Sequence, residues 1–257
     1  KLCNQLMEAF HLQKDLLVRR KTMKIIPAID LIDGESVRLV QGDYEQKSQM
    51  PRTPEEAIKF YEQYEQVKRI HVVDLIGAKE QAARESNLVG ELKQMTDIPL
   101  EIGGGLRNQE TIAIYDELGI DYFILGTRAI LEVDWLKEMV EKYPGRIFVG
   151  IDAKGENIYV DGWTKDSGRQ IDEFMAEIEA LDIAGVIYTD IAKDGMEAGP
   201  NVERTAQLQK STQHVVVASG GVRNQTDLDK LAENGIEEAI VGKAANTDSF
   251  WEGLQKL

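Results

Sequence analysis

Short apolar runs alternate with longer amphipathic stretches along most of the chain. The apolar runs are rich in Val, Ile and Leu, which is typical of strands buried on both faces. We expect strands at residues 25–31, 70–75, 99–102, 122–125, 147–151, 185–189, 215–218 and 239–241. We expect helices at residues 54–64, 88–95, 109–118, 135–143, 171–181, 202–210 and 226–233. This alternation predicts a parallel sheet covered by helices.

Local signals mark several of the helix starts. Thr53 stands before Pro54 and three positions before Glu56, which is the pattern of a capping box with proline at the first helical position. Asn108 and Asn224 each precede an amphipathic stretch and suit the N-cap position.

A glycine-rich segment occurs twice, each time between an apolar run and a helical pattern. The copies are Gly103-Gly104-Gly105-Leu106-Arg107-Asn108-Gln109 and Ser219-Gly220-Gly221-Val222-Arg223-Asn224-Gln225. Gly104 and Gly220 lie 116 positions apart, and the same offset relates Gly126 to Gly242 and Asp74 to Asp190. Such matches at one spacing indicate two related halves. Eight strand–helix units with twofold repetition predict a single (β/α)8 TIM barrel over residues 23–257, with half-barrels at about 23–146 and 147–257, rather than an open doubly wound sheet.

Residues 1–22 differ from the rest, because they carry five basic and two acidic residues in a chain of net charge −15. We interpret them as an N-terminal extension outside the fold and without function. A targeting peptide is the alternative, which the lack of serine and the presence of acidic residues disfavour.

Composition restricts the partners. The net charge of −15 and the lack of a dense Lys/Arg cluster argue against nucleic acid or an anionic membrane. No apolar run is long enough to cross a bilayer, so we expect a soluble protein. The single cysteine, Cys3, fits a reducing, cytoplasmic setting. We expect a monomer that binds a small molecule.

Two long segments, residues 32–52 and 153–169, follow the first and fifth strands. Each contains an alternating apolar piece that ends in glycine, so we expect a small hairpin in each. Loops at that end of a barrel strand lie above the catalytic face, which makes both hairpins lid candidates; plain surface loops are the alternative.

Acidic residues end two opposite strands. Asp30 ends the first strand and Asp152 the fifth, so we expect both at the mouth of the barrel, facing each other. Paired carboxylates suit general acid/base chemistry, because their surroundings can separate the two pKa values. A helix cap or a structural ion pair is the alternative for either residue.

The glycine turns predict anion binding, because glycine lets backbone amides approach a phosphate at a helix start. The candidate cradle residues are Gly104, Gly105, Arg107, Gly126 and Thr127 in the first half and Gly220, Gly221, Gly242 and Lys243 in the second. Two opposed cradles imply a substrate with a phosphate at each end. Tight turns of which only one copy binds phosphate are the alternative.

The loop after the sixth strand adds Thr189, Asp194 and Gly195 to the candidate site, and Trp163 could stack on a flat ring or simply pack. Neither His71 nor His214 belongs to a metal-binding pattern, and both open their strands, at the end of the barrel that serves stability. We expect no metal and no cofactor.

The segments Ile26-Pro27-Ala28-Ile29-Asp30-Leu31, Val40-Gln41-Gly42-Asp43-Tyr44, Gly103-Gly104-Gly105-Leu106-Arg107 and Asp190-Ile191-Ala192-Lys193-Asp194-Gly195 closely resemble the phosphoribosylformimino-aminoimidazole carboxamide ribotide isomerases of histidine biosynthesis. The similarity runs from Met23 to the end of the chain. It implies an Amadori rearrangement of a phosphorylated aminoaldose to an aminoketose, without redox chemistry or a metal. It also implies that Asp30 accepts a proton, that Asp152 donates one with Asp194 as its rival, that Thr189 lies beside the sugar, and that Trp163 covers the imidazole.

Three alternatives remain. The sister cyclase subunit of imidazole glycerol phosphate synthase shares the fold and the paired aspartates, but it has Lys where this chain has Gln41 and typically Cys where this chain has Ala28. Both differences favour the isomerase. A dual-specificity isomerase that also accepts phosphoribosylanthranilate is the second alternative, and a barrel that binds phosphorylated ligands without catalysis is the third.

Overall fold

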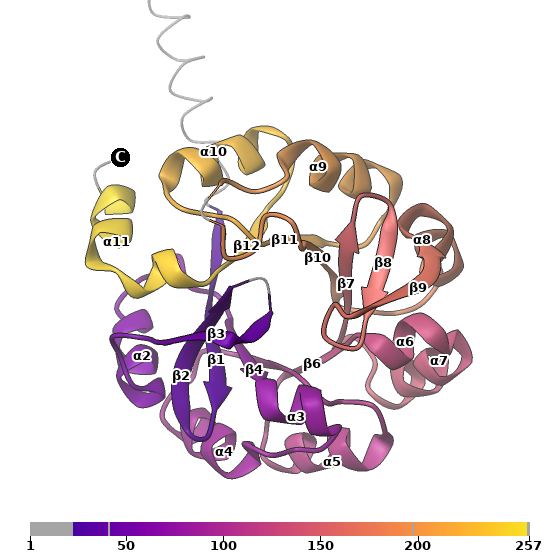
Figure 1. Ribbon diagram of the computed structural model, residues 1–257, viewed down its shortest axis with the longest axis horizontal. Helices are drawn as coiled ribbons and strands as arrows, with labels where there is room; N and C mark the ends of the chain where they lie inside the picture. The colour runs from indigo at the N-terminus through magenta and orange to yellow at the C-terminus, as the bar shows by residue number, and fades with distance from the viewer. Residues whose placement is uncertain (1–22, 41, 197, 256–257) are drawn as a thin grey trace, which may run out of the picture.

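Eight parallel strands close into a barrel in the computed structural model, which describes residues 23–40, 42–196 and 198–255 (Figure 1). The extension expected at residues 1–22 lies outside the described residues. The barrel strands are β1 (Lys24–Ile32), β4 (Ile70–Asp74), β5 (Leu100–Gly103), β6 (Tyr122–Leu125), β7 (Ile147–Lys154), β10 (Gly185–Asp190), β11 (Val216–Ser219) and β12 (Glu238–Val241). Each pairs in parallel with the next, β12 pairs with β1, and β7 pairs with β10, so the ring has no open edge. The predicted (β/α)8 barrel is confirmed.

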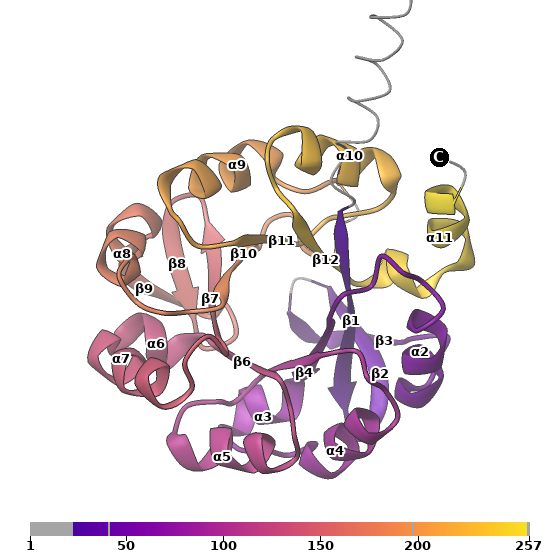
Figure 2. The same cartoon turned by 180° about the vertical axis from the view of Figure 1, so that it is seen from behind.

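Helices surround the strands, as the view from behind also shows (Figure 2). They are α2 (Pro54–Tyr61), α3 (Leu75–Glu80), α4 (Ser86–Gln94), α5 (Gln109–Glu117), α6 (Thr127–Leu131), α7 (Val133–Lys142), α8 (Ile171–Ile178), α9 (Val202–Ser211), α10 (Gln225–Glu233), the short 3-10 helix η1 (Lys243–Asn246) and α11 (Asp248–Gln255). The capping box at Thr53 is present, and the side chains of Asn108 and Asn224 each accept a hydrogen bond from the backbone at the start of α5 and α10.

Alternating strand residues face two different cores. Residues such as Ile29, Val72 and Ile102 point outward and pack against the helices in the main core. Ile26, Phe148, Ile187, Val217 and Ile240 point inward and fill the barrel. The helices therefore bury one apolar face each, while the interior of the barrel is a packed layer and not a pore.

Two hairpins lie over the same end of the barrel (Figure 1). β2 (Glu35–Val40) and β3 (Asp43–Gln49) form the first, and β2 pairs antiparallel with β1. β8 (Asn157–Val160) and β9 (Lys165–Gln170) form the second, and β8 pairs antiparallel with β7. Both predicted hairpins are confirmed.

Three helices and one 3-10 turn were not expected from the sequence. α3, α6 and η1 are only four to six residues long, which is too short for an apolar period to be recognised. α11 was missed although its Phe250 and Trp251 are buried, and Trp251 stacks on Tyr64 with ring centroids 4.1 Å apart.

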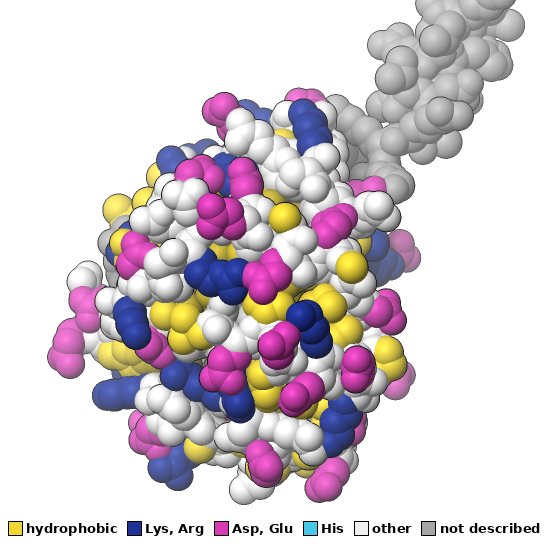
Figure 3. Space-filling model, turned by 90° about the vertical axis from the view of Figure 1, so that its right-hand side faces the viewer, with side chains coloured by type: hydrophobic (Ala, Val, Ile, Leu, Met, Phe, Trp, Pro, Cys, Tyr) yellow, Lys and Arg dark blue, Asp and Glu magenta, His cyan; other side chains and the backbone are white. Residues whose placement is uncertain are grey.

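No helix among residues 23–40, 42–196 and 198–255 is long and apolar enough to span a bilayer. On the side shown in Figure 3, acidic and basic side chains are interspersed, and apolar side chains are scattered between them.

Candidate active site

Carboxylates from three parts of the barrel meet at its mouth. Asp30 lies near the end of β1, Asp152 near the end of β7, and Asp194 in the loop after β10. Asp30 and Asp194, although far apart in the sequence, are joined by one guanidinium group. Arg38 donates from Nη1 to Asp30 Oδ2 at 3.1 Å and from Nη2 to Asp194 Oδ1 at 2.6 Å.

Arg38 was missed in the sequence. It lies on β2, where Val37 is in register with Asp30, so the hairpin folds it back over the end of β1. Only the antiparallel pairing of β1 with β2 places it there, and the alternating pattern of that segment was its one local signal. Its side chain is 19% exposed and those of Asp30 and Asp194 are 13% exposed. Burial disfavours the charged guanidinium, but the two carboxylates outweigh that effect and raise the pKa of Arg38.

The Nε group of Arg38 is buried and has no hydrogen-bond partner among the described residues. Buried polar groups are rarely left unsatisfied in folded proteins. The guanidinium also lies against Gly242, where a Cβ atom would come within 3.2 Å of Nη1. Arg38 therefore places an unsatisfied donor between the acids and the glycine turn after β12.

Asp152 lies in a different environment from Asp30. Burial raises its pKa, and the negative charge of Asp194 acts in the same direction. Hydrogen bonds from the Trp163 indole and the Thr189 hydroxyl oppose that rise. Thr189 is in register with Asp152 on the adjacent strand β10, so its hydroxyl is held beside the carboxyl. This arrangement favours the protonated form of Asp152 more than an exposed aspartate would.

Burial, neighbouring charges and hydrogen bonds also act on the pKa of Asp194. Burial raises its pKa most, Arg38 lowers it, and the charge of Asp30 raises it again. The backbone amide of Gly195 donates to it and favours the charged form. Asp152 and Asp194 are thus both candidates for a protonated acid at the mouth.

Asp74 and Asp190, the matched aspartates of the repeat, organise loops instead. Asp74 accepts hydrogen bonds from the backbone of Gly77, Arg84 and Glu85. Asp190 accepts from the backbone of Ala192 and from Asn201 Nδ2 at 2.7 Å. Both residues are buried and their carboxylates are bonded to these loops, so neither belongs to the acid cluster.

The glycine turns pack against the loops that these aspartates organise. Gly104 has a φ of +96°, and a Cβ atom there would lie 2.1 Å from the carbonyl oxygen of Asp74. Gly220 has a φ of +90°, and a Cβ atom there would lie 3.3 Å from the carbonyl oxygen of Asp190. A Cβ atom on Gly105 would collide with the carbonyl oxygen of Gly77, and one on Gly221 would lie 2.6 Å from that of Gly199. Close packing and positive φ values together therefore favour glycine at these turns, and anion binding remains a separate prediction for them.

The remaining cradle residues of the first half meet the second hairpin. Gly126 is the N-cap of α6 and has open space in front of it, and Thr127 is the first residue of that helix. The Thr127 hydroxyl accepts a hydrogen bond from the backbone of Asp161 at 3.0 Å. Arg107 pairs through Nη1 with Asp161 Oδ1 at 2.9 Å. In the second half, Gly242 and Lys243 hold the matching positions at the start of η1.

Trp163 joins the two hairpins above the acids. A Cβ atom on Gly42, at the end of the first hairpin, would lie 3.0 Å from the Trp163 ring. The same indole donates to Asp152. A cleft of about 520 Å³ is lined by Gly42, Asp43, Tyr44, Lys154, Gly162, Trp163, Thr164, Ile191 and Ala192. A pocket therefore lies between the tips of the two hairpins and the loop after β10, with an aromatic ring in its wall.

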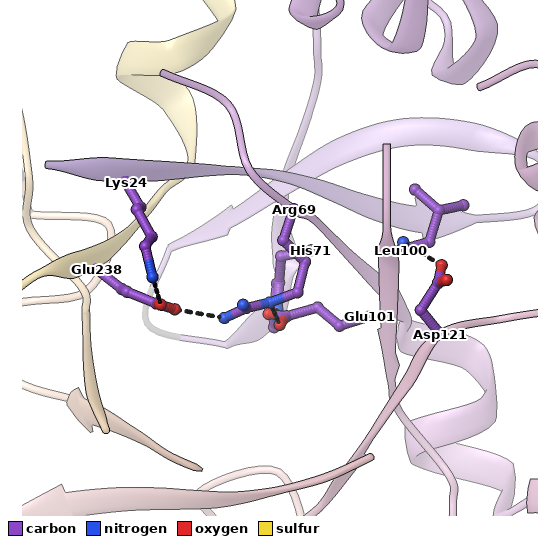
Figure 4. Close-up of polar contacts among 7 residues, drawn as sticks. All are labelled: Lys24, Arg69, His71, Leu100, Glu101, Asp121 and Glu238. Carbon is purple, nitrogen blue, oxygen red and sulfur yellow. Dashed lines mark hydrogen bonds and ion pairs between the residues drawn. The ribbon is translucent and has the colours of Figure 1, made fainter. Parts of the chain in front are cut away.

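A second polar network fills the opposite end of the barrel (Figure 4). Lys24 pairs with Glu238 at 2.8 Å, Arg69 bridges Glu238 and Glu101, and His71 Nδ1 lies 2.6 Å from Glu101. The sequence predicts His71 at the start of its strand. It is the second residue of β4 and belongs to this network.

One comparison with known proteins bears on this arrangement. A family model described as histidine biosynthesis protein matches residues 24–250, which is nearly all of the barrel. The match begins with β1 and ends within α11, so it includes all three acids and both pairs of glycine turns. The chain therefore belongs to the histidine biosynthesis protein family.

Proposed function

We propose that this protein is an aldose–ketose isomerase of histidine biosynthesis, which converts the phosphoribosylformimino-aminoimidazole carboxamide ribotide aminoaldose to its aminoketose by an Amadori rearrangement. The observation that carries the proposal is the cluster of three carboxylates in unlike surroundings. Arg38 pairs with both Asp30 and Asp194, whereas Asp152 is held by Trp163 and Thr189, and burial raises the pKa of Asp152 and of Asp194. Carboxyl groups whose pKa values are pushed apart can act as base and acid in one site.

The reaction needs one acid and one base. A protonated carboxyl, Asp152 with Asp194 as its rival, protonates the furanose ring oxygen while the C1′–O bond breaks, which opens the ring to an imine. Asp30 then removes the C2′ proton, and the resulting enolamine tautomerises to the ketone. The Thr189 hydroxyl, held beside Asp152, keeps that carboxyl oriented toward the sugar.

The two ends of the substrate would be held by the glycine turns. The first cradle comprises Gly104, Gly105, Arg107, Gly126 and Thr127, and the second comprises Gly195, Gly220, Gly221, Gly242 and Lys243. The first cradle lies before α5 and at the start of α6, and the second lies before α10 and at the start of η1; free backbone amides at such positions favour an anion. Trp163, beside Asp152, would cover the imidazole in the middle.

The cyclase of the same family is the second candidate. Ala28 faces the barrel interior on β1 and brings no functional group, at a position where the cyclase typically has Cys. Gln41, where the cyclase has Lys, lies outside the described residues. Both substitutions favour the isomerase.

Turnover assays on the purified protein test the proposal. The aminoaldose, the ketose with ammonia, and phosphoribosylanthranilate are supplied in parallel. We expect conversion of the aminoaldose. Conversion of the ketose with ammonia alone would identify a cyclase, and turnover of phosphoribosylanthranilate as well would identify a dual-specificity isomerase.

A further inference from the structure

The tip of the second hairpin occupies the first phosphate cradle. Asp161 lies directly after β8, and two groups of this one residue contact two cradle residues. Its carboxylate pairs with Arg107 at 2.9 Å, and its backbone amide donates to the Thr127 hydroxyl at 3.0 Å. Both partners come from the barrel, whereas Asp161 comes from the lid candidate above it.

The hairpin tip adopts an unusual backbone to reach this position. Asp161, Gly162 and Trp163 have φ values of 53°, 63° and 70°. Residues other than glycine rarely adopt this left-handed region, and they keep it only where surrounding contacts hold them. Here those contacts are Arg107 and Thr127 at one side, and Asp152 and Gly42 through Trp163 at the other.

The matching arginine of the second half has a different kind of partner. Arg223, which corresponds to Arg107 by the repeat offset, pairs with Asp227 of its own helix at 2.8 Å. The guanidinium of the second half is therefore held by the barrel, and that of the first half by a lid. Of these two matched arginines, Arg107 is therefore the one that pairs with a hairpin residue in the described part of the chain.

We propose that Asp161 is a built-in competitor for the substrate's terminal phosphate, so that a ligand enters the first cradle by displacing the lid carboxylate from Arg107. This inference rests on the proposed function, because it takes the first cradle as a phosphate site. A phosphate brings more negative charge than a carboxylate, and it can bind a guanidinium through two parallel hydrogen bonds. A ligand whose terminal group carries less negative charge displaces the Asp161 carboxylate from Arg107 less readily. Asp161 therefore favours ligands that place a phosphate in the first cradle. The exchange also frees the tip that carries Trp163.

The competition is expected to be weak enough for the substrate to win. The Asp161 side chain is 38% exposed, and ion pairs of that exposure contribute little. Removing the competitor should therefore tighten ligand binding by about two- to fivefold, rather than by orders of magnitude.

A double-mutant cycle tests the inference. Calorimetry measures the affinity for inorganic phosphate and for ribose 5-phosphate in the wild type, Asp161→Asn, Arg107→Met and the double variant. We expect Asp161→Asn to bind about two- to fivefold more tightly. That gain should disappear in the Arg107→Met background, because the competitor acts only through the guanidinium.

Asp116→Asn is the matched control. Asp116 pairs with Arg146 at 2.7 Å and is 39% exposed, which closely matches the Asp161 pair, but it lies at the end of α5 outside the mouth. It should leave phosphate affinity unchanged. Equal affinity in the wild type and Asp161→Asn, or an equal gain in both Arg107 backgrounds, would overturn the inference. Turnover of the aminoaldose by the wild type reports separately on the proposed function, so the two failures can be distinguished.

Discussion

At the scale of single residues, the mouth of the barrel gathers three carboxylates, two of which share the Arg38 guanidinium. Arg38 compensates Asp30 and Asp194 directly, whereas Asp152 depends on hydrogen bonds from Trp163 and Thr189. Burial disfavours a charged carboxylate, so the cluster lowers the stability of the folded protein. Such a loss of stability is common where residues serve catalysis.

Asp30→Asn should lower kcat by about 10²- to 10⁴-fold, because the amide cannot accept the C2′ proton. Its shape is conserved, so circular dichroism and the melting temperature should remain close to those of the wild type. Asp33→Asn is the control, since Asp33 is exposed in the adjacent turn at a φ of 52°, which asparagine tolerates. Turnover by Asp30→Asn at the rate of the control would remove Asp30 from the mechanism.

Asp152→Asn should abolish isomerisation and also stabilise the fold at pH 7. Because burial raises the pKa of Asp152, the folded protein binds its proton more tightly than the unfolded chain does. Its ionisation therefore lowers stability as the pH rises from the ordinary value of 3.8 through the raised pKa. The asparagine side chain does not ionise, so the variant does not lose this stability. Thermal melts should show a higher Tm for the variant than for the wild type at pH 7, and the difference in Tm should shrink near pH 3.8. A lower Tm for the variant at pH 7 would contradict the raised pKa of Asp152.

At the scale of elements, the glycine turns position one loop against the next. Gly104 packs on the carbonyl of Asp74, and Gly220 packs on that of Asp190, so the loop after one strand supports the loop after its neighbour. The loop under Gly220 carries Asp194, whose Cβ lies 3.4 Å from the position of an added methyl group. The turn therefore affects the acid as well as any bound anion.

Gly220→Ala should lower kcat and raise KM, because the methyl group at 3.3 Å from the Asp190 carbonyl must displace the loop that bears Asp194. The left-handed backbone adds a cost of about 1–2 kcal/mol in the free energy of unfolding. Gly235→Ala separates the two effects, since Gly235 has a φ of +87° and nothing within 4 Å. It should lose similar stability, measured by urea unfolding, while retaining full activity. Equal activity in both variants would show that the turn does not position Asp194.

At the scale of the whole molecule, buried charges help to close the barrel. The network of Lys24, Arg69, His71, Glu101 and Glu238 joins β12, β1, β4 and β5. The Arg69 guanidinium also lies 4.3 Å from the centre of the Phe148 ring on β7. The side chain of Glu101 is fully buried, yet its pKa is lowered, since His71 and Arg69 outweigh the effect of burial.

Arg69→Met should lower the free energy of unfolding by about 3–5 kcal/mol, because two buried carboxylates lose their shared partner. Lys137→Met removes an exposed cation from its pair with Asp134 and should leave the free energy of unfolding close to that of the wild type. Urea unfolding of both variants provides the measurement. A loss below about 1 kcal/mol for Arg69→Met would show that water or a rearranged side chain compensates the carboxylates.

The sequence determined the barrel and much of its mouth, because those features depend on local patterns. The spacing of apolar residues predicted the strands and the longer helices. The positions of Asp30 and Asp152 at strand ends indicated them as candidate catalytic residues. Helix and strand ends still differed by one to three residues, because frayed turns and neighbouring strands extend or shorten them. The short helices α3 and α6 carried too little periodicity to be recognised.

Only the tertiary structure decided which charges meet. Arg38 and Asp194 are 156 residues apart, and Asp161 reaches Arg107 only because the second hairpin folds over the barrel. Neither contact leaves a local pattern in the sequence, since each depends on how a hairpin is oriented on the closed barrel. Periodicity reports which face of an element is buried, whereas the partner of a buried charge is set by elements distant in the chain.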